Sequence, residues 1–170
     1  MKIAIIGLGL IGASIARGLK GKAEITGIDC DATTIDKACR ENVISQGSTR
    51  IPERLDCDMA VLAVPVGSIT SIAEMVVPHM QEGAVLTDTG STKAGIVRHI
   101  EAICPCFVGG HPIAGKENPG YDASQATLFQ GAVSIITPTS GSKKDCIEKV
   151  EWLWKSLGSS ITVMDPDRHD

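Results

Sequence analysis

Short runs of aliphatic residues alternate along the chain with longer segments in which apolar residues recur at helical spacing. The short runs are rich in Val and Ile, which favour strands. They predict strands over residues 2–6, 23–28, 59–63, 85–88, 106–109, 132–136 and 160–164. The longer segments predict helices over residues 10–20, 33–41, 69–77, 94–102 and 143–157. Strands and helices in alternation indicate βαβ units around a parallel sheet.

Most of the expected strands are continuous apolar runs, as is typical of parallel strands covered by helices on both faces. The pattern therefore predicts an α/β fold with a doubly wound, mostly parallel sheet. Neither an internal repeat nor a low-complexity tract divides the chain, so we expect one domain over residues 1–164. Residues 165–170 are a charged segment that starts at a proline turn, and we expect neither a helix nor a cap there.

The composition is that of a folded domain. Hydrophobic residues make up 43% of the 170 residues and charged residues 21%, which argues against intrinsic disorder. Aromatic residues make up only 3%, so we expect a mainly aliphatic core. The net charge of -4 argues against nucleic-acid binding, which usually needs a basic face. Small anionic ligands are compatible with this charge, because a few local donors can hold them.

The six cysteines are scattered, and we interpret them as reduced thiols of a cytoplasmic protein rather than a disulfide framework. Cys104 and Cys106 have one residue between them, whereas redox pairs and zinc knuckles have two or more. We therefore expect no metal site. Neither a signal peptide nor an apolar stretch long enough to cross a bilayer is recognisable.

A glycine motif follows the first expected strand and opens the first expected helix. It comprises Gly7, Leu8, Gly9, Leu10, Ile11 and Gly12. In this context the pattern is typical of a Rossmann-type dinucleotide site. The first glycine allows a tight turn, the second a close approach of a pyrophosphate, and the third close packing of helix and strand, while the helix N-terminus offers N–H donors. A glycine-rich turn without a ligand is the alternative.

Asp29 ends the second expected strand, close to the spacing at which an acid accepts hydrogen bonds from the adenosine ribose. A carboxylate there repels a 2'-phosphate, so NAD is favoured over NADP, and the absence of Arg from residues 30–34 supports this indirectly. A turn or capping role for Asp29 is the alternative. Ala63, Val64 and Pro65 lie at the end of another strand, at the same edge of the sheet, and are further cofactor-binding candidates, although Pro65 could simply end the strand.

Two later segments carry candidate chemistry at strand ends. Ser91 and Lys93 follow the strand that ends at Asp88, where Ser91 could instead be a helix N-cap. His111 lies between two glycines and a proline, at the end of the next strand. Its imidazole titrates near neutrality and could accept a proton as a hydride leaves. The other three histidines lack this context and are interpreted as surface or cap residues: His79, His99 and His169.

With these motifs in view, the chain resembles the prephenate and arogenate dehydrogenase family. The motifs that carry the resemblance are GLGLIGASIARGL at residues 7–19, DTGSTK at 88–93, GGHPIAGKENPGYDAS at 109–124, LF at 128–129 and DPDRHD at 165–170. The resemblance implies NAD-dependent oxidative decarboxylation of prephenate to 4-hydroxyphenylpyruvate, or of arogenate to tyrosine. His111 would then be the base, Ser91 would hydrogen-bond the substrate hydroxyl and the histidine, and Lys93, Lys116 and Glu117 would line or gate the substrate pocket.

The resemblance also implies a C-terminal helical domain that dimerises, for which residues 165–170 would begin the connection. We therefore expect a homodimer for the full-length protein, and apolar surface exposed on this chain taken alone. Two alternatives stay open. One is another NAD(P)-dependent β-hydroxyacid or imine dehydrogenase, although the HPIAG segment at residues 111–115 favours the first interpretation. The other is a non-catalytic NAD-binding module, which has no need of Ser91 and His111.

Overall fold

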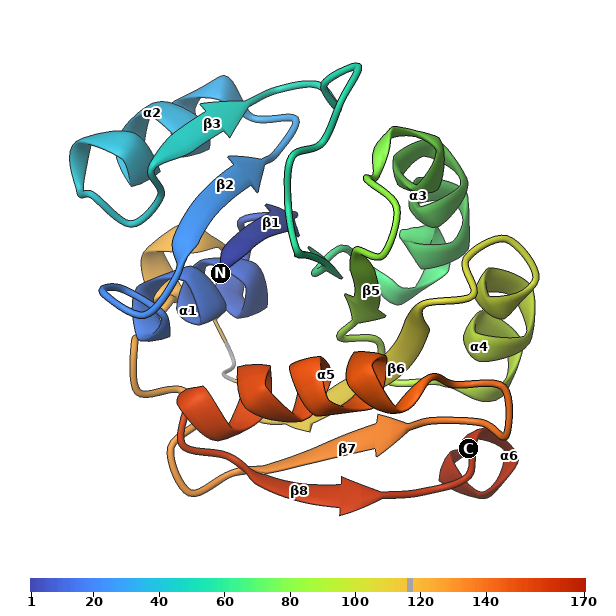
Figure 1. Ribbon diagram of the computed structural model, residues 1–170. Coiled ribbons are helices and arrows are strands. Elements are labelled where there is room, and N and C mark those ends of the chain that lie inside the picture. The colour runs from blue at the N-terminus through green and yellow to red at the C-terminus, as the bar shows by residue number, and fades with distance from the viewer. Residues whose placement is uncertain (116–117) are drawn as a thin grey trace.

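A computed structural model describes residues 1–115 and 118–170. One sheet runs through the molecule in the order β3-β2-β1-β4-β5-β6-β7-β8 (Figure 1). Its strands are β1 (Lys2–Ile6), β2 (Glu24–Ile28), β3 (Gln46–Ser48), β4 (Met59–Leu62), β5 (Val85–Asp88), β6 (Phe107–Ile113), β7 (Val133–Thr137) and β8 (Ser160–Val163). Neighbouring strands are parallel except β6 and β7, which pair antiparallel. The predicted Rossmann-type, mostly parallel fold is confirmed.

The chain order reverses at β1. Strands β2 and β3 lie on one side of β1, and the chain then crosses back to place β4 on the other side. In open α/β sheets, ligands bind outside the carboxyl ends of the strands at such a switch point. The topology therefore predicts a ligand site at the carboxyl ends of β1 and β4.

Six α-helices accompany the sheet in the described part of the chain. They are α1 (Leu10–Gly18), α2 (Ala32–Arg40), α3 (Ile69–Val76), α4 (Ala94–Glu101), α5 (Lys144–Ser156) and α6 (Pro166–His169). Short 3-10 turns flank α3, at Val66–Ser68 and Val77–His79, and a third covers Tyr121–Ala123. The five longer helices match the predicted ones to within two residues at each end.

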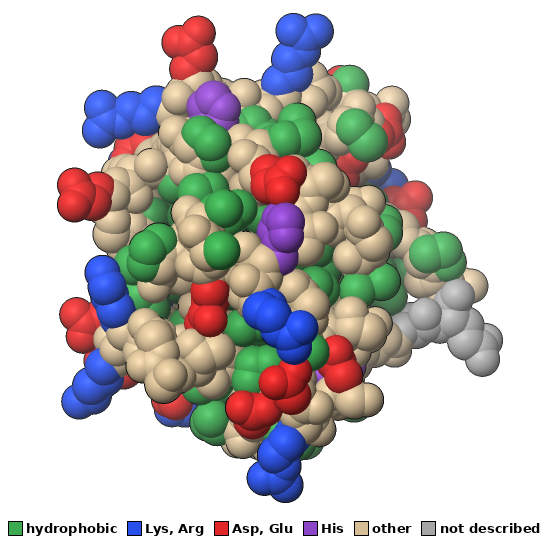
Figure 2. Space-filling model, turned by 90° about the vertical axis from the view of Figure 1, so that its right-hand side faces the viewer, with side chains coloured by type: hydrophobic (Ala, Val, Ile, Leu, Met, Phe, Trp, Pro, Cys, Tyr) green, Lys and Arg blue, Asp and Glu red, His purple; other side chains and the backbone are tan. Residues whose placement is uncertain are grey.

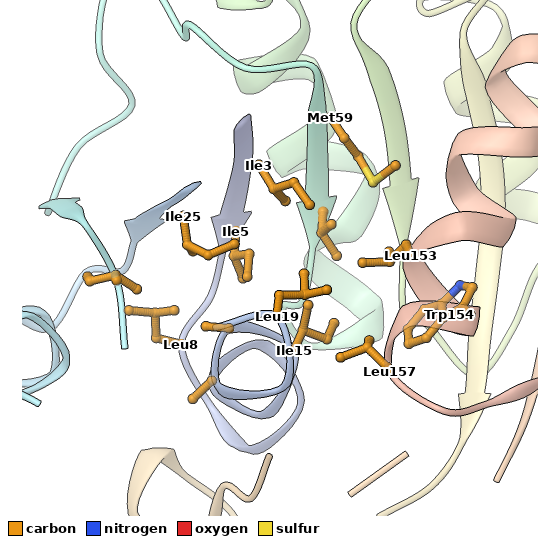
Figure 3. Packing of buried hydrophobic residues seen from close by; sticks show 14 of the residues in the cluster. Ile3, Ile5, Leu8, Ile15, Leu19, Ile25, Met59, Leu153, Trp154 and Leu157 are labelled. Carbon is orange, nitrogen blue, oxygen red and sulfur yellow. The ribbon is translucent and has the colours of Figure 1, made fainter. Parts of the chain in front are cut away.

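Two apolar layers explain why the strands read as continuous hydrophobic runs. Ile3 and Ile5 of β1 point to one face of the sheet, where they pack with side chains of α1, α2 and α5. Ala4 and Ile6 point to the other face, which α3 and α4 cover. Figure 3 shows α1 side chains packed against β1 on one side and against Trp154 and its neighbours of α5 on the other. Side-chain alternation with a period of two thus buries both faces.

The structure corrects two expectations. First, β6 does not end at Gly109: it continues to Ile113, because the antiparallel strand β7 pairs with its second half and His111 lies opposite Ile135. Second, residues 165–170 do contain a capped helix. The Asp165 carboxylate accepts hydrogen bonds from the N–H groups of Asp167 and Arg168, and Pro166 occupies the first helical position. Helix α6 packs beside α4 and belongs to the same body (Figure 1).

The surface shows no dominant charge on the side where α3 and α4 lie. Acidic and basic side chains are intermingled there, with hydrophobic ones between them (Figure 2). Exposed apolar side chains include Ile113 and Val133, which are 51% and 40% exposed and lie opposite one another on β6 and β7. None of the described helices is long and apolar enough to cross a membrane.

Candidate functional site at the carboxyl edge of the sheet

The glycine loop joins β1 to α1 with very little space around it. Gly7 has a φ of 93°, which L side chains rarely adopt, and a Cβ there would lie 2.4 Å from the carbonyl oxygen of Ala63. A Cβ on Gly12 would lie 1.8 Å from the carbonyl oxygen of Gly7. These two positions therefore require glycine so that strand, loop and helix can meet, which is the role predicted for the motif's first and third glycines.

Gly9 is different, because its side-chain position faces open space. A Cβ there would meet no atom of the described residues within 4 Å. Gly9 is also the N-cap of α1, and no side chain of the described residues caps this helix. The first-turn N–H groups of α1 thus open toward a space that a ligand can enter, and helix N-termini with this geometry favour anions.

A cleft of about 890 Å³ adjoins this loop at the switch point. It brings together six of the residues predicted to bind a cofactor: Gly7, Gly9, Asp29, Ala63, Val64 and Pro65. Pro65 lies beyond the end of β4, directly before the 3-10 turn at Val66–Ser68, and lines the cleft. Leu8 is buried in the core, and its contribution to the loop is its backbone N–H.

The Asp29 carboxylate ties the glycine loop to the end of β2. One oxygen accepts a hydrogen bond of 2.7 Å from the N–H of Leu8, and the other accepts one of 2.9 Å from the N–H of Asp31. The turn role considered from the sequence is therefore real. It does not compete with a ligand role, because Asp29 also lines the cleft and carboxylate oxygens accept more than one hydrogen bond. The cap of α2 is Asp31, whose side chain accepts from the N–H of Thr33.

Several cleft residues were not predicted from the sequence, because they come from a loop, from the exposed side of α3 and from the 3-10 turn that follows it. They are Thr49, Arg50, Ile51, Ile72, Met75, Pro78 and His79. Arg50 matters most, because it places a cation in the same cleft as Asp29, although residues 30–34 contain no Arg. The signal that could have found it is the pairing of β2 with β3, which brings residues just beyond Ser48 next to Asp29.

A buried ion pair supports the neighbouring part of the edge. Asp88 and Lys93 are both fully buried and form a salt bridge. The Asp88 carboxylate also accepts hydrogen bonds from the N–H groups of Gly90 and Gly110, at 2.8 and 3.1 Å. The Lys93 ammonium donates to the carbonyl oxygen of Gly110 at 3.0 Å. Burial raises the pKa of Asp88 and lowers the pKa of Lys93, while the pair itself opposes both shifts.

This position differs from the expectation that Lys93 lines the substrate pocket. Its side chain is 0% exposed and is directed at Asp88 and Gly110, so it holds the backbone on which His111 sits. Ser91, by contrast, is exposed and lies before the start of α4, whose N-cap is Lys93. The alternative that Ser91 caps α4 is therefore wrong. The cap is the Asp170 carboxylate, which accepts from the N–H groups of Lys93 and Ala94 at 2.7 and 3.0 Å.

His111 lies half-buried on β6, on the face of the sheet that α4 and α6 share. Its Nδ1 is 2.9 Å from Nε2 of His169, and His169 Nδ1 is 2.8 Å from Oδ1 of Asp170. The pKa of His111 is lowered, chiefly by burial and then by the nearby His169 and Lys93. The interpretation of His169 as a surface or cap residue is wrong: its side chain is 5% exposed and contacts the candidate base. His79, also interpreted that way, lines the cleft.

Lys116 and Glu117, the remaining predicted substrate contacts, lie outside the described residues. Within residues 1–115 and 118–170, no group of three or more His, Cys, Asp or Glu side chains is arranged to hold a metal ion. The described edge thus offers a cleft with an anion-binding helix end, an exposed hydroxyl and a half-buried imidazole. This combination suits the binding of a dinucleotide in the cleft and the acceptance of a proton by the imidazole.

Comparisons with known proteins agree with this geometry. The family described as prephenate dehydrogenase, nucleotide-binding domain, matches residues 15–163. The chain is 32% identical over 174 residues to the cyclohexadienyl dehydrogenase of Zymomonas mobilis, covering 99% of this chain and 59% of that protein. It is similar to the crystal structure of prephenate dehydrogenase from A. aeolicus in complex with hydroxyphenyl propionate and NAD+, with a TM-score of 0.94 and 34% identity.

A third similar protein is the arogenate dehydrogenase of Synechocystis, with a TM-score of 0.96 and 29% identity. The chain covers 61% of each of the two crystallised proteins, and so spans about three fifths of the length of these relatives. The family match extends over most of the chain. The chain therefore belongs to the prephenate dehydrogenase family, as its nucleotide-binding domain.

Proposed function

We propose that the chain binds NAD in the cleft at the switch point and contributes the base for oxidative decarboxylation of prephenate or arogenate. The observation that carries the proposal is the shared edge of the sheet, where the Gly9 cleft follows β1, exposed Ser91 follows β5 and half-buried His111 lies in the second half of β6. The A. aeolicus relative that was crystallised with NAD+ and an aromatic acid supports it. The family match favours it over the β-hydroxyacid dehydrogenase alternative.

The cofactor would be held mainly by backbone groups. The open side of Gly9 and the first-turn N–H groups of α1 fit a pyrophosphate, because no side chain of the described residues fills that space. The Asp29 carboxylate, at the end of β2, fits the ribose hydroxyls. Bound NAD would supply the hydride acceptor.

His111 and Ser91 would act on the substrate hydroxyl. His111 accepts the proton of the ring hydroxyl while the ring carbon that carries this hydroxyl loses a hydride. Ser91 holds the same hydroxyl by a hydrogen bond. Loss of the ring carboxylate as CO2 leaves its bonding electron pair in the ring, which becomes aromatic. The proton held by His111 then returns to the phenolate oxygen. The lowered pKa of His111 keeps the imidazole unprotonated and ready to accept at neutral pH.

The test is NADH formation from NAD with prephenate and, separately, with arogenate, measured on the longest polypeptide that carries this chain. Replacing the base by His111→Asn should lower kcat by about 10²- to 10⁴-fold. His99→Asn is the matched control, because His99 is exposed and pairs with Glu74 on the surface. Activity in neither assay, or equal activity of His111→Asn and the parent, would contradict the proposal.

Asp29 and Arg50 provide a test of cofactor choice. Asp29→Ser removes the negative charge from the cleft and leaves the exposed Arg50 there. We expect NADP binding to strengthen by about tenfold or more, since a charge-assisted hydrogen bond contributes roughly 1.5–3 kcal/mol. The double variant Asp29→Ser with Arg50→Ala should lose this gain. Isothermal titration with both nucleotides measures it, and unchanged preference in Asp29→Ser would show that Asp29 does not select the cofactor.

A further inference from the structure

Two polar side chains, His169 and Asp170, form a continuous hydrogen-bonded chain with the candidate base His111. His111 Nδ1 lies 2.9 Å from His169 Nε2, and His169 Nδ1 lies 2.8 Å from Asp170 Oδ1. The two imidazole rings meet edge to face, with centroids 5.1 Å apart and planes 62° apart. The His169 side chain is 5% exposed, so water does not compete freely for its nitrogens. His169 is 58 residues from His111 in sequence, and α6 brings it there.

The far end of this chain is fixed by the backbone. The Asp170 carboxylate accepts hydrogen bonds from the N–H groups of Lys93 and Ala94 at the N-terminus of α4. Such donors stabilise the ionised carboxylate, and they lower the pKa of Asp170 together with the larger effect of its hydrogen bond to His169. An ionised carboxylate can only accept hydrogen bonds. Asp170 therefore requires a hydrogen on Nδ1 of His169.

The hydrogen on Nδ1 of His169 determines which ring nitrogen of His111 carries a hydrogen. A neutral imidazole carries one hydrogen, so His169 with its hydrogen on Nδ1 has a bare Nε2 that must accept. The only ring nitrogen of His111 within reach of it is Nδ1, which must then donate. His111 in turn has its hydrogen on Nδ1, and its Nε2 is left with a free electron pair.

We propose that His169 and Asp170 are positioning residues that hold His111 in the tautomer with a bare Nε2, the nitrogen that accepts the substrate proton. This inference rests on the proposed role of His111 as the base. The contact also orients the ring, because rotation about the His111 side chain would break the Nδ1 hydrogen bond. When His111 gains a proton, its Nδ1–H stays donated to His169, and the Asp170 carboxylate lies at the end of the chain to stabilise the charge.

The direct test reads the ring nitrogens by NMR and needs neither cofactor nor substrate. Two-bond ¹H–¹⁵N spectra of the ¹⁵N-labelled chain distinguish Nδ1–H from Nε2–H for each of its four histidines. We expect the Nδ1–H form at His111 in the parent. His169→Phe removes the acceptor and should move His111 to the Nε2–H form. His169→Gln keeps an acceptor oxygen near the former Nε2 and should retain the Nδ1–H form.

A backbone ¹H–¹⁵N spectrum of each variant, with dispersion like that of the parent, controls for folding. The inference is overturned if His111 is already Nε2–H in the parent, or if His169→Phe leaves its tautomer unchanged. If both folded variants shift it equally, the acceptor atom does not set the tautomer, which also overturns the inference.

A kinetic measurement separates this inference from the proposed function. In the active polypeptide, His169→Phe should lower kcat by about 10- to 100-fold, by analogy with hydrogen-bond partners that orient metal-bound histidines, while the dissociation constant of NAD stays unchanged. His169→Gln should recover much of kcat. An inactive parent with the predicted tautomers would contradict the proposed function alone. An active parent in which His169→Phe has full kcat would contradict the positioning role alone.

Discussion

At the scale of single residues, the site depends on groups whose roles differ from what their sequence neighbours suggest. The sequence places Lys93 in a hydroxyl-rich segment beside a sheet edge, which resembles a ligand-binding loop. In the structure its ammonium is buried with Asp88 and donates to Gly110, next to His111. Burial of a lysine depends on a partner from another element, and residue order alone does not reveal that partner.

Lys93→Met should therefore destabilise the fold rather than only reduce activity. It leaves the Asp88 carboxylate buried without its counter-charge, and breaking a buried pair in this way costs about 3–5 kcal/mol. Urea unfolding of the chain measures the change. The control is Lys20→Met, an exposed lysine, which should alter the free energy of unfolding by less than about 0.5 kcal/mol. A Lys93→Met variant as stable as the parent would contradict a structural role for the pair.

The lowered pKa of His111 predicts a pH effect of definite sign. Burial, His169 and Lys93 lower this pKa, and Asp170 opposes them, while Asp88 neutralises Lys93. Below about pH 6.5 the unfolded chain takes up a proton at His111 before the folded chain does. The stability contributed by neutral His111 is thus complete above about pH 6.5 and is lost as the pH falls through the folded pKa.

This pH dependence is tested by measuring the free energy of unfolding of the parent and of His111→Gln between about pH 8 and pH 5. The parent should lose more stability than the variant over this range. Equal slopes would mean that the imidazole titrates alike in the folded and unfolded chains.

At the scale of elements, the hydrophobic pattern identified every strand and helix that has a buried apolar face. It missed β3, whose residues Gln46–Ser48 are polar or small and mostly exposed. It also missed α6, which has four residues and whose one apolar residue is Pro166. A signal for α6 was present, since an aspartate before a proline is a typical helix start, but it was interpreted as a turn. The contact of His169 with His111 has no such signal.

Asp165→Ala should loosen α6 without unfolding the domain. The Asp165 carboxylate accepts from two first-turn N–H groups, and loss of a cap costs about 1 kcal/mol. Amide hydrogen exchange should accelerate in α6 and at the N-terminus of α4, where Asp170 would lose its fixed position. Asp31→Ala, which removes the cap of α2, should affect α2 and leave α6 unchanged. Unaltered exchange in α6 after Asp165→Ala would show that packing on α4 alone holds this helix.

At the scale of the whole molecule, the order of strands places chemistry from distant parts of the chain at one edge. The switch point at β1 opens the cleft beside Gly9 and Asp29, and the parallel strands β4 and β5 end at the same edge. The antiparallel pairing of β6 with β7 extends β6 so that His111 meets α6. The sequence predicted the cleft because its glycine motif is local. It did not predict the support behind His111, which comes from α4, α6 and the Asp88–Lys93 pair together.

Binding of NAD at this edge of the sheet can be measured with a change at Gly9. Any side chain at Gly9 enters the space assigned to the pyrophosphate, yet its Cβ would touch none of the described residues and its φ of -72° suits an L residue. Isothermal titration of the parent and of Gly9→Val with NAD, after unfolding curves show equal stability, is therefore decisive. We expect the parent to bind NAD and the variant to lose at least about tenfold in affinity. Equal affinity of the two, or no binding to the folded parent, would contradict it.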